Sequence, residues 1–166
     1  NDETIDITVQ PDGAVQVTGK YHFIRPKKAS DNFKITYPFP DPKEFGDVEV
    51  KRILVNGKEA NPVEKHLRNL KRITLNLFFE GKDDMEMEIV FVQKPNYNHY
   101  KYILTTTKTW KKALQKSLIT LRLPAGINLD KCSYNVTETD GEEGEKIFRL
   151  LEFNFYPDKD FEFSWK

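Results

Sequence analysis

Hydrophobic and polar residues alternate with a period of two in the segment from Leu70 to Gln93. Such alternation places one set of side chains on each face of a β-strand. The segment 81–84, Gly-Lys-Asp-Asp, interrupts the pattern and suits a tight reversal, because glycine tolerates positive φ and aspartate forms local hydrogen bonds. The sequence therefore predicts a long antiparallel hairpin at the centre of the fold. Its expected core residues are Leu75, Leu77, Ile89 and Phe91.

A second hairpin is predicted at the start of the chain. Residues 4–9 and 14–24 alternate in the same way, and the segment 10–13, Gln-Pro-Asp-Gly, has the composition of a tight turn. Gly19 stands where an inward side chain is expected, which predicts a bulge or a bend in the second strand.

Prolines and glycines mark the next connections. A short strand is expected over residues 33–37, and the three prolines of the segment 38–42 end it at a sheet edge or at a crossover between sheets. The Asn-Gly pair at 56–57 follows another strand, over residues 48–55, and predicts a two-residue hairpin turn. Residues 61–70 fit either a helix or a returning strand.

The second half of the chain repeats the β pattern. Irregular chain or one to two helical turns are expected over 106–116, and a charged turn over 140–145. A closing hairpin is expected from two strands separated by the segment 157–160. The predicted strands of this half are 97–105, 117–123, 147–156 and 161–165.

About nine or ten strands at this spacing are typical of sandwiches and barrels. No repeat or linker divides the chain, so we expect one domain over residues 1–166. The segments 38–42 and 106–116 look like crossovers between sheets, which favours an all-β, antiparallel sandwich of the immunoglobulin-like type. The alternative is an up-and-down β-barrel like that of the lipocalins.

The composition excludes several partners. Lysine plus arginine and aspartate plus glutamate both number 26, so the formal net charge is zero, which argues against nucleic acid. No apolar run approaches the ~20 residues of a membrane span. Cys132 is the only cysteine, so an internal disulfide is impossible. The start at Asn1, without methionine, fits a processed export signal or an excised fragment, and we expect an extracytoplasmic protein.

No catalytic or metal-binding constellation is evident. His22, His66 and His99 fall in different predicted elements, and none has a nearby carboxylate or cysteine at ligand spacing. The acidic segment 140–145 is interpreted as a solvated turn, since the pattern of a calcium loop is missing. Cys132 is expected to be a structural thiol, and we expect no cofactor, no metal and no enzymatic activity.

The aromatic residues of the segment 97–110 are the least ordinary feature of the sequence. Asparagines and a histidine are interleaved with them, a combination that can stack sugar rings or grip an extended peptide. Core packing and cross-strand pairing would also explain them, and Trp110 itself is expected to pack against the core. The candidate ligand-binding residues are Tyr97, Tyr100, Tyr102 and Trp110.

The second half also carries a resemblance to known proteins. Its elements are the segment Tyr-Ile-Leu-Thr-Thr at 102–106, then Trp110, then the strand at 119–124, and finally the aromatic segments at 153–157 and 160–163. Together they resemble a pattern in uncharacterised envelope and secreted proteins of bacteria. The resemblance covers the last third to half of the chain. It implies an exported β-sandwich of unknown role and transfers no site residue.

The function expected from the sequence is that of a non-catalytic extracytoplasmic module with a binding or structural role, whose partner is a protein or a glycan. Two alternatives stay open. One is a β-barrel carrier of a small apolar ligand, suggested by the 12 phenylalanines. The other is a carbohydrate-binding module that uses the four aromatic residues named above.

Overall fold

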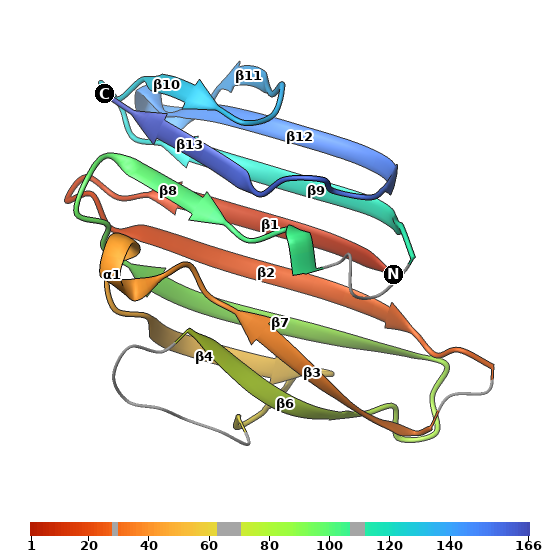
Figure 1. Ribbon diagram of the computed structural model, residues 1–166. Coiled ribbons are helices and arrows are strands. Elements are labelled where there is room, and N and C mark those ends of the chain that lie inside the picture. Colours follow the sequence, from red (N-terminus) through yellow and green to blue (C-terminus); the bar gives the residue numbers. More distant parts are fainter. Residues whose placement is uncertain (28–29, 63–70, 107–111) are drawn as a thin grey trace.

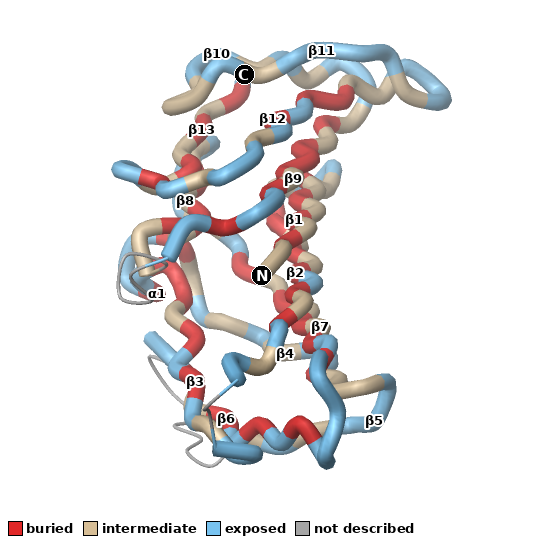
Figure 2. Tube along the Cα trace, turned by 90° about the vertical axis from the view of Figure 1, so that its right-hand side faces the viewer, coloured by how far each residue is buried: buried red, intermediate tan, exposed pale blue. Residues whose placement is uncertain are grey.

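The computed structural model describes residues 1–27, 30–62, 71–106 and 112–166. These residues form a β-sandwich of two layers (Figures 1 and 2). One layer is an eight-stranded sheet. Its strands, in spatial order, are β11 (Thr137–Asp140), β12 (Lys146–Phe155), β9 (Leu114–Leu123), β1 (Asp2–Val9), β2 (Val15–Ile24), β7 (Asp84–Gln93), β4 (Glu49–Val55) and β5 (Lys58–Glu59).

The second layer consists of two smaller sheets side by side. A three-stranded sheet contains β10 (Leu129–Cys132), β13 (Phe161–Trp165) and β8 (His99–Tyr102), and a two-stranded sheet contains β3 (Asn32–Pro38) and β6 (Arg72–Phe78). Both lie on the same side of the large sheet (Figure 2). The short helical elements of the described chain include α1 (Pro42–Phe45) and the 3₁₀ turn η2 (Glu142–Gly144).

This arrangement confirms the predicted all-β sandwich. The described strands do not close on themselves, so the alternative barrel is not the fold of this chain. Among the strands that the structure describes, neighbours are antiparallel except for the parallel pair β1–β9. The described strands number 13, eight of them in the large sheet, and so exceed the seven to nine of immunoglobulin sandwiches. No helix in the described ranges is long and apolar enough to cross a bilayer.

The hydrophobic core lies between the two layers. Side chains alternate along β1, β2, β7 and β9, so every second residue of the large sheet faces the smaller sheets. The four predicted core residues, Leu75, Leu77, Ile89 and Phe91, are each no more than 1% exposed, which confirms their assignment.

The predicted central hairpin, however, is wrong. Strand β6 pairs with β3, whereas β7 pairs with β2 and β4, so the two arms lie in different layers. The segment 79–83 crosses from one layer to the other. Both arms still bury their apolar faces, because the faces meet across the core instead of lying side by side in one sheet.

The predicted closing hairpin is wrong for the same reason. Strand β12 pairs with β9 and β11 in the large sheet, and β13 pairs with β10 and β8 in the second layer. The segment 156–160 is therefore also a connection between layers. A reversal of the chain with Pro and Asp residues suits either geometry, so the turn composition does not distinguish them.

The other two predicted turns are confirmed. Strands β1 and β2 pair in continuous register, and β4 and β5 are joined by Asn56 and Gly57 with φ of 50° and 76°, as a two-residue hairpin requires. The bulge expected at Gly19 is absent, since β2 keeps its register with both neighbours. A Cβ atom on Gly19 would lie 2.7 Å from the Tyr21 hydroxyl, so the glycine makes room for that ring. The undecided segment 61–70 lies outside the described residues from position 63 onward.

Candidate functional site

The structure separates the aromatic residues predicted to bind a ligand. Tyr97 precedes β8 and is 80% exposed, whereas Tyr100 and Tyr102 are 0% and 5% exposed. Alternation along β8 turns these two rings into the core, so neither can stack against a ligand at the surface. Trp110 lies outside the described residues. Of the candidate aromatic residues in the described ranges, Tyr97 alone presents its ring to solvent.

The buried tyrosines join the three sheets. The hydroxyl of Tyr21 donates to that of Tyr37 at 3.0 Å and also contacts that of Tyr102, while the hydroxyls of Tyr37 and Tyr102 are 3.2 Å apart. These rings come from β2, β3 and β8, one strand from each sheet. Burial raises the pKa of Tyr37 to about 12 and holds the pKa values of the other two well above their usual range. The cluster is thus a neutral hydrogen-bonded contact between layers.

A buried carboxyl group adjoins this cluster. Glu3 on β1 is 3% exposed and accepts a hydrogen bond from the Ser117 hydroxyl at 2.7 Å. Burial raises the pKa of Glu3 to about 7, although the bond from Ser117 acts in the opposite direction. A cavity of about 30 Å³, lined by Glu3 and the three tyrosines among others, has room for about one water molecule. Its size excludes a larger ligand.

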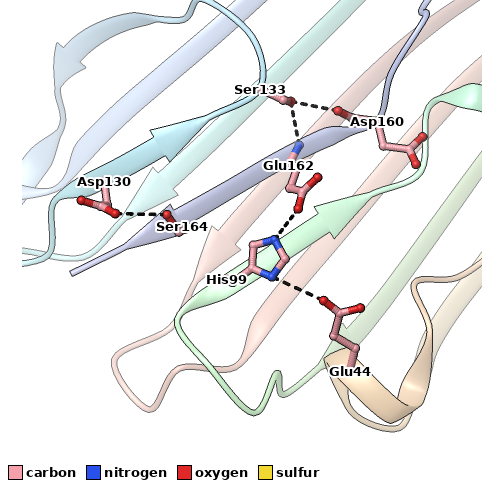
Figure 3. A network of polar contacts seen from close by, with 7 residues as sticks. All are labelled: Glu44, His99, Asp130, Ser133, Asp160, Glu162 and Ser164. Carbon is pink, nitrogen blue, oxygen red and sulfur yellow. Dashed lines mark hydrogen bonds and ion pairs between the residues drawn. The ribbon is translucent and has the colours of Figure 1, made fainter.

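A wider hollow lies on the outer face of the three-stranded sheet, and Figure 3 shows His99, Ser133, Glu162 and Ser164 among its lining residues. We call it the His99 hollow. Its volume is about 440 Å³, and its polar lining is His99, Lys131, Cys132, Ser133, Glu162 and Ser164. These residues share the outer face because Phe161, Phe163 and Trp165 of β13 take the inward positions. The exposed Tyr97 stands two residues before His99 in the chain.

Two carboxylates fix the His99 ring (Figure 3). Nε2 of His99 lies 2.7 Å from Oε1 of Glu162 on the adjacent strand, and Nδ1 lies 3.6 Å from Oε1 of Glu44 on α1. The ring also contacts Phe45, with centroids 5.4 Å apart. With both nitrogens facing carboxylates, the imidazole is held in one orientation.

Local sequence explains why α1 presents Glu44 at this point. The Asp41 side chain accepts from the Lys43 amide at 3.0 Å, Pro42 occupies the first helical turn, and Gly46 ends the helix with φ of 83°. Asn96 then ties the helix to the loop before β8, since its side-chain amide donates to the Lys43 carbonyl at 3.2 Å.

The other end of the hollow is fixed by Ser133. Its hydroxyl donates to the Asp160 carbonyl at 2.8 Å and accepts from the Glu162 amide at 2.9 Å. The Asp160 carboxylate accepts from the amides of Leu104 and Thr105, both at 3.0 Å. Both hydrogen bonds of the Ser133 hydroxyl are made with backbone groups. Ser133 is therefore not hydrogen-bonded to His99, as a nucleophile would be to its base.

The arrangement does not favour metal binding either. The two carboxylates contact opposite nitrogens of the His99 ring, so a single ion could not meet both of them. Within the described parts of the chain, no group of three histidine, cysteine or acidic side chains could hold a metal ion. Cys132 is half-buried, and burial raises the pKa of its thiol, which disfavours the reactive thiolate. The His99 hollow is therefore a rigid polar surface with donors and acceptors side by side.

Sequence reasoning missed the carboxylate partners of the histidines. His99 meets Glu162, which is 63 residues away, and Nε2 of His22 lies 3.0 Å from Oδ2 of Asp84, 62 residues away. Only strand pairing between distant segments brings these groups together, and no local spacing signals it. His66 lies outside the described residues.

A second hollow, of about 330 Å³, lies on the outer face of the eight-stranded sheet. Side chains of β1, β2 and β7 that point away from the core line it, together with Leu54 and Gly57 at one end. Its charged lining comprises Asp2, Lys20, His22, Glu86 and Glu88. We call it the large-sheet hollow.

No family model and no curated protein matches this sequence. Solved structures of similar fold were found. A "putative nutrient binding protein" from Legionella pneumophila is 11% identical with a TM-score of 0.73, and the match covers 99% of this chain and 65% of that one. An M1 zinc metallopeptidase from Deinococcus radiodurans is 9% identical with a TM-score of 0.57, covering 99% and 41%. Native yeast LTA4 hydrolase is 11% identical with a TM-score of 0.58, covering 99% and 28%.

Such low identities show a shared fold. The chain spans less than two thirds of the length of each of these three proteins, so in each of them the fold is one part of a longer polypeptide.

Proposed function

We propose that this chain is a non-catalytic binding module that takes a polyhydroxylated ligand, such as a saccharide, in the His99 hollow. One observation carries the proposal: the exposed Tyr97 stands two residues before His99, whose ring lines a pre-oriented polar surface, and its carbonyl accepts from the His99 amide at 2.7 Å. Saccharides offer many hydroxyl groups and an apolar ring face, and such a surface matches both. The nutrient-binding name of the Legionella protein, which shares the fold, supports a binding role.

The contacts within the hollow suit hydroxyl ligands. Glu162 is held by His99 and keeps its second carboxylate oxygen as an acceptor, while Lys131 supplies a donor. The Ser164 hydroxyl donates to Oδ2 of Asp130 at 3.5 Å and keeps its oxygen as a further acceptor (Figure 3). Because His99, Glu162 and Ser133 are already fixed by the protein, a ligand would order few side chains on binding, which lowers the entropic cost of association.

Lack of catalysis is part of the same proposal. Support comes from His99 itself, whose two nitrogens face carboxylates and not a hydroxyl or thiol nucleophile. We also propose an extracytoplasmic location, supported by the resemblance of the second half to envelope and secreted proteins. Fractionation of cells that make the complete protein with a tag would test the location, and recovery in the cytoplasm would contradict it.

Isothermal titration calorimetry with neutral oligosaccharides tests the binding role. We expect saturable binding that Tyr97→Ala and Glu162→Gln each weaken about two- to tenfold, the range for one stacked ring or one ordinary hydrogen bond. Phe78→Ala is the matched control, since Phe78 is 48% exposed on β6 of the other small sheet and should not matter.

If Tyr97→Ala left the affinity for the oligosaccharide unchanged, the ligand would bind elsewhere, and the proposed site would be contradicted. Turnover of a glycoside or peptide by the isolated chain, lost in Glu162→Gln, would replace the binding role with an enzymatic one.

A further inference from the structure

The outer face of the eight-stranded sheet is not covered by the second layer (Figure 2). Strand register places its outward side chains in rows that cross the sheet. One row is Leu151, Leu118, Thr4, Lys20 and Glu88, in order along β12, β9, β1, β2 and β7. The row beside it is Phe153, Lys116, Asp2, His22 and Glu86. The two rows form one continuous surface, which is apolar at β12 and charged at β2 and β7.

The β12 end of this surface is apolar. Phe153 is 63% exposed and Leu151 is 50% exposed, and Leu118 lies opposite Leu151 on β9. A solvated sheet face normally carries polar residues at such positions. Covering these side chains would remove apolar area from water, which is favourable.

The other end is the large-sheet hollow, which has unpaired negative charge. Glu88 contacts both Lys20 and Arg52, and His22 contacts Asp84, so these charges are matched. Glu86 has no ion pair among the described residues. Oδ1 of Asp2 is buried and, in the part of the chain that the structure describes, has no hydrogen-bond partner. Asp2 and Glu86 flank His22 on the neighbouring strands.

We propose that this face binds an extended peptide segment of a partner protein, with a basic side chain at Asp2 and Glu86 and an apolar side chain on Phe153 and Leu151. Charge complementarity selects a basic segment, because the unpaired groups of the hollow are carboxylates. The site lies on the opposite layer from the His99 hollow, so this proposal does not depend on the function proposed above.

The strand spacing defines the peptide. With ~4.8 Å between neighbouring strands, Asp2 lies about 10 Å and Glu86 about 19 Å from the β12 end, measured across the strands. An extended peptide advances ~3.3 Å per residue and presents every second side chain to one face, so its basic residues should stand about four and six positions from the apolar one. Lys116 lies between the two ends and opposes a basic ligand.

Fluorescence anisotropy with the labelled peptide Phe-Ser-Gly-Ser-Lys-Ser-Lys, in which both lysines share a face with the phenylalanine, tests the proposal. We expect saturable binding to the full chain at low ionic strength, weakened by added salt. Phe153→Ser and Glu86→Gln should each raise the dissociation constant about three- to fivefold, and Lys116→Glu should lower it by a similar factor. Phe78→Ser, an exposed aromatic on the other layer, is the control and should leave binding unchanged.

Glu86→Gln should raise the dissociation constant and Lys116→Glu should lower it, a pattern that loss of folding would not produce. Circular dichroism of each variant checks the folding directly. Several results would overturn the proposal. One is equal binding of a peptide with Glu in place of Lys, and another is insensitivity to all three substitutions. A third is a dimer in solution that Phe153→Ser dissociates, since the face would then be occupied by a second copy of the chain.

Discussion

The carboxyl group of Glu3 on β1 accepts a hydrogen bond from the hydroxyl of Ser117 on β9, 2.7 Å away, inside the core. The two residues are register partners in the parallel pair of the large sheet. Burial disfavours the ionised form and raises the pKa of Glu3 from its ordinary 4.5 to about 7, although the bond from Ser117 acts in the opposite direction.

Stability should therefore fall as pH rises through this window. Below pH 4.5 Glu3 is protonated in both the folded and the unfolded state. Between 4.5 and about 7 only the unfolded state loses the proton, so each step in pH favours unfolding. The full loss amounts to about 3 kcal/mol above pH 7.

Glu3→Gln removes this dependence, and the variant should unfold at higher urea than the parent protein at pH 8 but not at pH 4.5. The difference between parent and variant at the two pH values is the measurement, since it cancels other titrating groups. A constant difference would mean that Glu3 is ionised in the fold.

Phe91→Ala should lower the free energy of unfolding by ~3–5 kcal/mol, a large part of a typical ~5–15 kcal/mol. Phe91 is fully buried and packs edge-on against Phe39 of the connection after β3, with ring centroids 4.9 Å apart. The cavity would open between layers, not within a hairpin. Phe78→Ala, on an exposed position of β6, should cost less than about 0.5 kcal/mol in the same urea melts.

Gly46→Ala should destabilise the chain by about 3 kcal/mol, and Gly57→Ala by about 1 kcal/mol. Both glycines have positive φ, 83° and 76°, so both substitutions carry the backbone cost. Only at Gly46 would the new Cβ meet another atom, the Lys94 carbonyl oxygen at 2.3 Å. The difference between the two melts measures that collision. Because Gly46 ends α1, the first variant should also disturb the contact of Glu44 with His99, visible as a shifted imidazole resonance.

Cys132 should react slowly with iodoacetamide at pH 7, and faster once urea unfolds the chain. Burial raises the pKa of its thiol, although nearby backbone amides and Lys159 oppose the shift, so the thiolate fraction stays small. Rapid alkylation of the folded protein near pH 6 would instead identify an activated cysteine.

Alternation predicted which face of each strand is buried, and did so without exception for Leu75, Leu77, Ile89 and Phe91. It did not predict which strands are neighbours. A period of two describes one strand and its two faces, whereas pairing depends on backbone hydrogen bonds to segments far away in sequence. That is why 81–84 and 157–160 were predicted to be hairpin turns, although the chain passes from one layer to the other at both places.

The candidate site was less accessible from sequence for the same reason. The exposed side of β8 and β13 is implied by their aromatic alternation, so His99 and Glu162 could each be placed on the surface. Their adjacency follows from the β13–β8 register, in which Ser164 opposes His99 and Glu162 opposes Lys101. Tyr100 and Tyr102 were ambiguous, because a tyrosine suits a core and a binding face equally.

The position of β1 has a consequence for how the chain assembles during synthesis. Its antiparallel partner β2 follows immediately, but its parallel partner β9 begins only at residue 114. Until then one edge of β1 has unpaired amides and carbonyls, and residues 2–93 can complete only the β1-β2-β7-β4-β5 half of the large sheet. A nascent chain paused before β9 would present an open strand edge, and an open edge is what a holding chaperone or another unfinished copy can pair with.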